Sequence, residues 1–297
     1  MNEDFIAQLR RQLVDAAGRT HRLPVVSLAW LRPALVTATV VAAVVAGVIA
    51  LGVPANDDEP VATGATVAFR ITGGDAAAAA AVLQDRLDAV ALAGTVRAAS
   101  GHVLVDLADD TPADRRTLDG LTRPGRLAIY EWEANLVGEG PLTREAARRL
   151  AERADGRRMV EHGRGWYVLE DKPALTNRDL AGAEQIIAID PGAGAPGVAL
   201  RFTEDGKTAF HELTRDVARR GADLAAPGVP AIENAQHFAI VVDDRVTALP
   251  FINFQEAPDG VDGEGGAQIS GGLTLQSARE LAAVLDSGPL PSALAPQ

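Results

Sequence analysis

The sequence contains no cysteine and few aromatic residues. The absence of cysteine excludes disulfide bonds, thiol catalysis and cysteine-ligated metal sites. Phe, Trp and Tyr make up only 4% of the chain whereas apolar residues make up 47%, so the core has to be built mainly from Ala, Val, Leu and Ile. Lysine is also scarce, and Lys172 and Lys207 are the only two.

Positive charge is in the minority, and it is unevenly placed. The chain of 297 residues has a formal net charge of −12. Residues 1–32 contain five arginines against three acidic residues, so the remainder is more acidic than the whole. Such an acidic surface repels phosphate backbones, and we expect no nucleic-acid binding. The length favours an anchor followed by a two-part globular region.

One long apolar run, from Pro33 to Val53, contains no charged residue. At about 1.5 Å per residue a helix of this length spans the ~30 Å hydrocarbon core of a bilayer. The alternatives are a buried core helix and a cleaved signal peptide. A signal peptide is disfavoured because 32 residues precede the run and Gly52-Val53-Pro54 is a poor cleavage site. The run therefore predicts a single transmembrane helix, 33–53.

The flanks of the run predict its orientation. Five arginines precede it and three acidic residues follow at 57–59, so the positive-inside rule places the N-terminus in the cytoplasm. We therefore expect a single-pass plasma membrane protein with an extracytoplasmic C-terminal domain. Residues 1–32 carry an apolar stripe at Phe5, Leu9 and Leu13. This amphipathic tail either lies on the membrane, binds a cytoplasmic partner or has no partner.

A polar linker, 54–64, leads to a block of alternating strand and helix patterns over 65–130. Asp75 is expected to cap a helix that places Ala79, Leu83, Leu87 and Val90 on one face. The succession indicates a β-α-β-β-α-β, ferredoxin-like unit that ends in a strand at 127–130. Its other predicted elements are strands at 67–71 and 103–107 and a helix at 112–121.

A second α+β block follows. A helix bearing Phe210, Leu213 and Val217 is expected after a strand at 198–202. The remaining predicted elements are a helix at 143–154, a strand at 166–169, a hairpin of 238–242 with 246–249, a short strand at 268–270 and a closing helix bearing Leu275, Ala278, Leu281, Ala282 and Leu285 on one face.

Three sequence runs within these blocks resemble the SecD family. In 198–214 a strand meets a helix start with the spacing Phe-x-x-x-Gly-x-x-x-Phe, and 238–253 resembles the family's hairpin and the proline after it. The run 267–291 is similar to the closing motif. The residues that carry the resemblance are Phe202, Gly206, Phe210, Asp243, Pro250, Ile269, Ser270, Gly271, Gly288, Leu290 and Pro291.

The resemblance implies an α+β periplasmic domain behind a single N-terminal transmembrane helix. It divides the chain into a SecD-like ferredoxin-like base with an inserted head. The implied ranges are 65–130 for the first part of the base, 131–250 for the head, 251–291 for the rest of the base with its closing helix, and 292–297 for a tail. In the family the head is thought to contact the emerging preprotein, so the implied partners are SecD, SecF and unfolded preprotein.

The sequence also departs from the family. Family members continue into several further membrane helices, whereas this sequence stops after the closing motif. The Asp-Leu-x-Gly-Gly motif that usually follows the first membrane helix is missing. Asp243-Asp244 stands where the family favours Asp-Gly, at a turn that needs positive φ. The expected protein is a SecD-like ectodomain on an anchor.

Fragments that resemble catalytic or metal-binding motifs are incomplete. Gly206-Lys207-Thr208 lacks the first glycine of a phosphate-binding loop, and His211-Glu212 lacks the second histidine of a zinc protease. Ser270 lacks the first glycine of a nucleophile elbow. The other candidates are the isolated His102, His162 and His237, the pair Glu131 and Glu133, expected on the solvated face of a strand, and the glycine-rich loop with Asp259, Asp262 and Glu264. We therefore predict no catalytic, cofactor-binding or metal-binding residue.

Two functions remain open. The first is a non-catalytic, membrane-anchored binding module for exported or unfolded polypeptide, associated with the Sec translocase. The second is an envelope scaffold or signalling protein that reuses the head fold to couple an outside ligand to the cytoplasmic tail. The span 33–53 has no ionisable side chain, so we expect no proton conduction by this helix alone.

Overall fold

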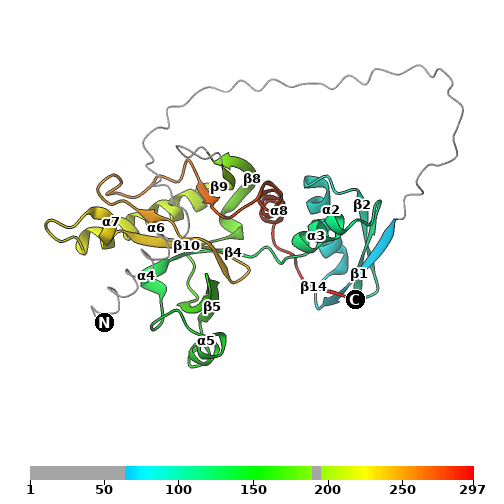
Figure 1. Ribbon diagram of the computed structural model, residues 1–297, viewed down its shortest axis with the longest axis horizontal. Helices are drawn as coiled ribbons and strands as arrows, with labels where there is room; N and C mark the ends of the chain where they lie inside the picture. The colour runs from blue at the N-terminus through cyan, green and yellow to red at the C-terminus, as the bar shows by residue number, and fades with distance from the viewer. Residues whose placement is uncertain (1–63, 189–194) are drawn as a thin grey trace, which may run out of the picture.

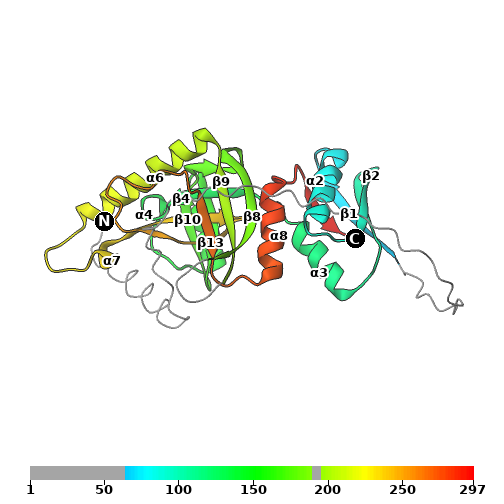
Figure 2. The same cartoon turned by 90° about the horizontal axis from the view of Figure 1, so that it is seen from above.

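The computed structural model describes residues 64–188 and 195–297, which form two lobes (Figures 1 and 2). The predicted tail, membrane helix and nearly all of the predicted linker fall within residues 1–63, outside the described residues. In the described ranges no helix is both long and apolar enough to cross a bilayer. The order of helices and strands confirms the predicted α+β class.

The small lobe is an antiparallel sheet with strand order β14-β1-β3-β2. Its elements are β1 (Ala65–Thr72), α2 (Ala76–Ala89), β2 (Gly94–Ala99), β3 (His102–Leu107), α3 (Pro112–Leu121) and β14 (Ala293–Pro296). The succession β-α-β-β-α-β is that of a ferredoxin-like unit. The predicted cap Asp75 accepts a hydrogen bond from the backbone of α2, and Thr111 forms a capping box at α3.

The strand that closes the small lobe differs from the predicted one. Residues 127–130 belong to β4 (Leu127–Glu131), which pairs with β10 and β7 of the other lobe. The sheet is closed instead by β14, within the predicted tail 292–297, where Pro296 lies opposite Phe69 of β1. An alternating pattern identifies a strand but not its partner, because strand pairing depends on tertiary packing.

The large lobe combines two sheets with a long helix. One sheet has strand order β6-β5-β11-β10-β4-β7, with β12 paired to β10, and the other has β13-β9-β8. The elements after β4 are α4 (Trp132–Asn135), α5 (Arg144–Ala151), β5 (Arg157–His162), β6 (Gly165–Glu170), β7 (Leu175–Thr176), the 3-10 helix η1 (Asn177–Asp179), β8 (Leu180–Ala188), β9 (Ala195–Phe202), α6 (Glu204–Asp223), α7 (Ala231–Asn234), β10 (Gln236–Val242), β11 (Arg245–Ala248), β12 (Phe251–Ile252) and β13 (Ala267–Ser270).

The division between the lobes also differs from the implied ranges. Strand β13 lies within the range 251–291 that the resemblance assigns to the base, yet it pairs with β9 in the large lobe. Ile269 of β13 is fully buried in the same core as Phe202 and Phe210. The large lobe therefore extends from β4 to β13.

Helix α8 (Leu275–Asp286) lies between the two lobes and belongs to both cores (Figure 2). Leu281 and Leu285 pack into the large-lobe core, whereas Val284 packs into the small-lobe core. Leu275, predicted on the buried face, is 56% exposed because it opens the first turn of the helix. One helix thus joins the two cores.

Candidate functional site

The fragments that resemble catalytic motifs do not assemble into a site. His211 on α6 has its ring Nδ1 3.2 Å from the carbonyl oxygen of Val261, and Ser270 is the exposed last residue of β13. Across the described part of the chain, no three His, Cys, Asp or Glu side chains lie together as a metal-binding group.

Glu131 and Glu133 do not share a solvated strand face, because β4 ends at Glu131 and α4 begins at the next residue. The carboxylate of Glu131 pairs with Arg220 at 2.6 Å. Glu133 lies 2.6 Å from Nδ1 of His237 and also accepts the backbone N–H of His237. Both carboxylates are largely buried and hold α4 against α6 and β10, so their role here is structural.

The residues Phe202, Gly206 and Phe210 form the join between β9 and α6. The Phe202 and Phe210 ring centroids are 5.0 Å apart, and Phe238 packs on Phe210 at 5.5 Å. A Cβ atom at position 206 would lie 2.2 Å from the carbonyl oxygen of Asp179, so only glycine allows this close approach. These residues anchor the large lobe.

Asp243 and Asp244 form the turn of the β10–β11 hairpin with φ of 52° and 62°. The turn therefore forms with two non-glycine residues in the left-handed region. Asp243 accepts a hydrogen bond from the backbone N–H of Arg126 at 2.9 Å, which helps to hold this conformation. The carbonyl of Pro250 accepts the backbone N–H of Phe238.

The closing motif falls on both sides of α8. Ile269 and Ser270 end β13, and Gly271, which follows the strand, has φ of 89°. Leu290, which is buried, donates its backbone N–H to the carbonyl of Pro124, and Pro291, which is exposed, leads into β14. The motif thus supplies the return connection between the lobes.

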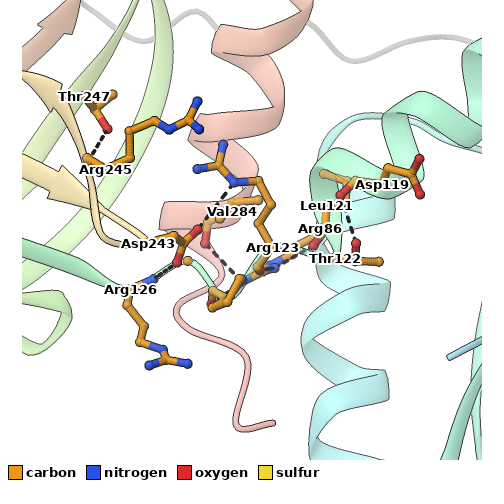
Figure 3. A network of polar contacts seen from close by, with 12 residues as sticks. Arg86, Asp119, Leu121, Thr122, Arg123, Arg126, Asp243, Arg245, Thr247 and Val284 are labelled. Atoms are coloured by element: carbon orange, nitrogen blue, oxygen red, sulfur yellow. Dashed lines mark hydrogen bonds and ion pairs between the residues drawn. The ribbon is translucent and has the colours of Figure 1, made fainter. Parts of the chain in front are cut away.

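A buried arginine organises the junction of the lobes (Figure 3). Arg86 projects from α2 and is fully inaccessible to solvent. Its guanidinium donates to the carbonyls of Leu121 and Arg123 at 2.6 Å and 2.5 Å and of Gly288, in the closing motif, at 2.8 Å. Its Nε donates to the hydroxyl of Ser287 at 3.0 Å.

These acceptors lie where α3 and α8 end. Carbonyls at the C-terminus of a helix lack intrahelical partners and carry partial negative charge, so one cation caps two helices at once. Burial lowers the pKa of Arg86 to about 10, and the group stays charged at neutral pH. The sequence holds a signal for this residue: Arg86 stands on the helix face predicted to bury Leu83 and Leu87.

Asp243 holds the same junction from the large lobe. Its Oδ2 lies 3.4 Å from Nε of Arg123, and its backbone N–H donates to the carbonyl of Arg126. Arg123 and Arg126 belong to the connection from α3 to β4. Figure 3 shows Arg86 and Asp243 on either side of Arg123. The outgoing connection is therefore fixed by side chains from both lobes.

The far end of the large lobe carries an apolar tip, residues 224–232, between α6 and α7. In both views it lies opposite the small lobe (Figures 1 and 2). The tip contains no charged residue, and Leu224 and Ile232 are 40% and 53% exposed. Exposed apolar side chains gathered at one place mark sites of contact with other molecules. The sequence does not single out this tip, because its short apolar stretch carries no motif.

At each of two sheet edges, one backbone N–H is bonded by a helix side chain. At the β2 edge, the backbone N–H of Val96 donates to Gln84 of α2 at 2.7 Å. At the β8 edge, the backbone N–H of Ala183 donates to Asp286 of α8 at 3.0 Å. Side chains that occupy edge groups oppose the addition of a foreign strand.

A comparison with protein families matches residues 148–292 to the model described as SecDF, P1 head subdomain. Among curated proteins, the protein translocase subunit SecDF of Brucella abortus is 34% identical over 128 residues, which are 43% of this chain and 14% of that protein. The SecDF subunit of Thermus thermophilus is 30% identical over 217 residues, which are 71% of this chain and 25% of that protein. The chain thus spans a quarter or less of these two relatives.

Solved structures of SecDF share the fold. One, from work on a membrane component SecDF that enhances protein export, matches with a TM-score of 0.51 and 24% identity over 78% of this chain and 97% of that chain. The crystal structure of SecDF in a super-membrane-facing form matches with a TM-score of 0.52 and 23% identity over 81% of this chain and 31% of that chain.

The fold thus defines a mixed α+β domain of the kind found in SecDF. More particularly, the chain carries a SecD-like domain, similar to the first periplasmic domain of SecD.

Proposed function

We propose that this protein is a membrane-anchored, non-catalytic SecD-like module that binds exported or unfolded polypeptide and works beside the Sec translocase. Matched relatives are named as translocase subunits, which supports a role in protein translocation. In this proposal the small lobe corresponds to the family's base and the large lobe to its head. The expected partners are SecD, SecF and preprotein.

The apolar tip carries the proposal. An unfolded chain exposes apolar side chains that a folded protein buries, and a charge-free surface can bind them without regard to sequence. Leu224 and Ile232 offer such a surface at the end of the lobe farthest from β1.

The junction supports the same role by holding the tip at a fixed place. Arg86 and Asp243 fix the outgoing connection, and α8 contributes to both cores. A tip on a lobe joined in this way keeps its place relative to the small lobe.

Crosslinking with a defined substrate tests the proposal. A photoreactive amino acid at Pro227 of the tip is expected to form adducts with an exported preprotein that is arrested during translocation by a tightly folded fusion domain. The same amino acid at the exposed Ala108 of the small lobe serves as the matched position. Equal adducts from both positions, or none from the tip, would contradict the assignment of the tip.

Substitution gives a second readout. Leu224→Ser with Ile232→Ser is expected to weaken binding of a reduced and alkylated, permanently unfolded polypeptide at least about tenfold, because two exposed apolar contacts are lost. Ile187→Ser, at a side chain 51% exposed on β8, is the matched control and should leave the affinity unchanged. If the tip variant also binds normally, the scaffold or signalling function becomes the better explanation.

A further inference from the structure

One segment of the large lobe has a charge opposite to its surroundings. Residues 144–164, which form α5, β5 and the turn into β6, contain seven arginines and four acidic residues. The rest of residues 64–297 contains sixteen basic and thirty acidic residues. Helix α5 projects at the rim of the large lobe, away from both the tip and the small lobe (Figure 1).

The neighbouring carboxylates neutralise this segment only in part. Glu145 is shared by Arg148 at 3.7 Å and Arg149 at 3.3 Å. In the described part of the chain, Arg153 and Arg164 have no carboxylate within ion-pair distance, and both are exposed. We name Arg144, Arg148, Arg149, Arg153 and Arg164 the arginine patch.

An aromatic side chain lies within this patch. The guanidinium carbon of Arg144 is 5.3 Å from the ring centroid of Trp166, which is half-buried at the start of β6. Tryptophan beside arginine suits the boundary between water and lipid, where the ring contacts the headgroup region and the cation meets phosphate.

The sequence predicts a bilayer at the N-terminal side of the described domain. The predicted membrane helix ends at Val53, and β1 begins at Ala65. The intervening residues, fully extended, reach at most about 40 Å. A tether of this length keeps the domain at high effective concentration relative to the membrane. A second copy of the chain also offers an acidic surface to the patch, and the dilution test below distinguishes it from the bilayer.

We propose that the arginine patch docks on the anionic phospholipid headgroups of the bilayer that holds the predicted anchor. Clusters of basic side chains near an anionic surface gain about 1 kcal/mol per residue, a factor of about five each. Docking tilts the large lobe towards the membrane and leaves the apolar tip free, since the tip and α5 occupy different parts of the lobe.

The full chain, reconstituted in vesicles, allows a direct test because it has no native cysteine. A polarity-sensitive dye on Ala154→Cys, an exposed position next to Arg153, reports on the patch. We expect a blue shift in vesicles of phosphatidylcholine with 30% phosphatidylglycerol and no shift in pure phosphatidylcholine. High salt should reverse the shift, because exposed charges are screened.

Charge reversal identifies the surface. Arg148→Glu with Arg149→Glu should lower the docked-to-undocked ratio at least tenfold. Arg115→Glu with Arg116→Glu on α3 changes the same charge at adjacent exposed arginines of the small lobe and should leave the ratio unchanged. If the Arg148→Glu, Arg149→Glu variant fails to fold, as judged by its circular dichroism spectrum, the milder Arg149→Gln and the salt titration take its place in the test.

Three results would overturn the proposal. They are an equal shift in neutral and anionic vesicles, an equal loss in both double variants, or a shift that disappears when the protein is diluted within the vesicles. The last result would assign the patch to contact between copies.

Discussion

Arg86 and Gly288 lie 202 positions apart in the sequence, and the guanidinium of Arg86 donates a 2.8 Å hydrogen bond to the carbonyl of Gly288. This bond ties α2, near the start of the small lobe, to the connection that follows α8. The guanidinium meets carbonyl and hydroxyl oxygens in place of a carboxylate, so its charge is balanced by helix ends.

Replacing this arginine should be costly. Arg86→Met keeps an unbranched apolar stem but removes every donor, and carbonyls at two buried helix ends lose their partner. We expect a loss of about 3 kcal/mol in the free energy of unfolding, measured by urea denaturation, because buried carbonyls are left without a donor. Arg97→Met, at an exposed pair with Asp106, is the control and should cost less than about 1 kcal/mol. Equal losses would show that the buried network contributes nothing specific.

In the β10–β11 turn, substitutions at two neighbouring positions separate backbone strain from side-chain hydrogen bonding. Asp244→Gly restores the Asp-Gly dipeptide that suits this turn, relieving about 1 kcal/mol of left-handed strain while losing a half-exposed pair with Arg158. We expect a net change within about 0.5 kcal/mol. Asp243→Ala keeps the strain and loses the bond to the N–H of Arg126, and should cost about 2 kcal/mol. Thermal melting of both variants checks the order, and the reverse order would contradict it.

Phe210 should be an energetic anchor of the large lobe. Its side chain is 3% exposed and lies between the rings of Phe202 and Phe238. Phe210→Ala is expected to cost about 3–4 kcal/mol, because the truncation leaves a cavity. Ile232→Ala, at the exposed tip, should stay within about 0.5 kcal/mol. Chemical denaturation measures both, and a small loss at Phe210 would mean that the core repacks around it.

Asp171 should make stability depend on pH in the acid range. The hydrogen bonds from the Arg158 guanidinium hold the pKa of this carboxyl below its usual value, with a further contribution from the Tyr130 hydroxyl, against the opposing effect of burial. Because the folded pKa lies below the unfolded one, near 3.9, the stabilisation is present above about pH 4 and is lost as pH falls through the folded value.

The matched variants Asp171→Asn and Asp109→Asn test this dependence. Urea unfolding between about pH 2 and pH 6 should show a shallower slope for Asp171→Asn than for the unsubstituted chain. Asp109 is exposed, and its amide variant should keep the full slope. Parallel slopes for all three proteins would exclude Asp171 as the source.

The proposed topology can be tested with introduced cysteines. A cysteine at the exposed Asp109 should react with a membrane-impermeant thiol reagent in intact cells, whereas one at Gly18 should not. The expectation follows from the excess of arginine before the run 33–53. The opposite labelling pattern would reverse the orientation.

The sequence predicts the local structure of this protein better than it predicts which strands pair. Helix caps are local: Asp75, Thr143 and Thr274 each bond to the first turn of the helix that follows. A few neighbouring residues are therefore enough to predict them. The partner of β1 could not be read in this way, because β14 is more than 200 residues away and only the completed core selects it. Glu131 and Glu133 gave a misleading pattern for the same reason, since Arg220 and His237 come from distant elements.

In the candidate site, too, local features are predictable from the sequence and long-range contacts are not. Phe202, Gly206 and Phe210 are close in sequence, and their spacing alone indicates the join of β9 and α6. Arg86 is different, because its acceptors come from the ends of two helices that the sequence does not bring together. A lone arginine on an apolar helix face is the available signal, and its meaning depends on what surrounds that face.

The pairing of β14 with β1 has a consequence for the order in which the protein can be built. During synthesis β1, α2, β2, β3 and α3 leave the ribosome first. The free edge of β1 stays open until residues 293–296 have been synthesised. Helix α8, which covers part of the same core, also arrives after the large lobe. The lobe that emerges first is therefore completed last, and until then it displays one open strand edge and uncovered apolar side chains. Nascent chains stalled just before α8 should for this reason require a chaperone, whereas chains released a few tens of residues later should not.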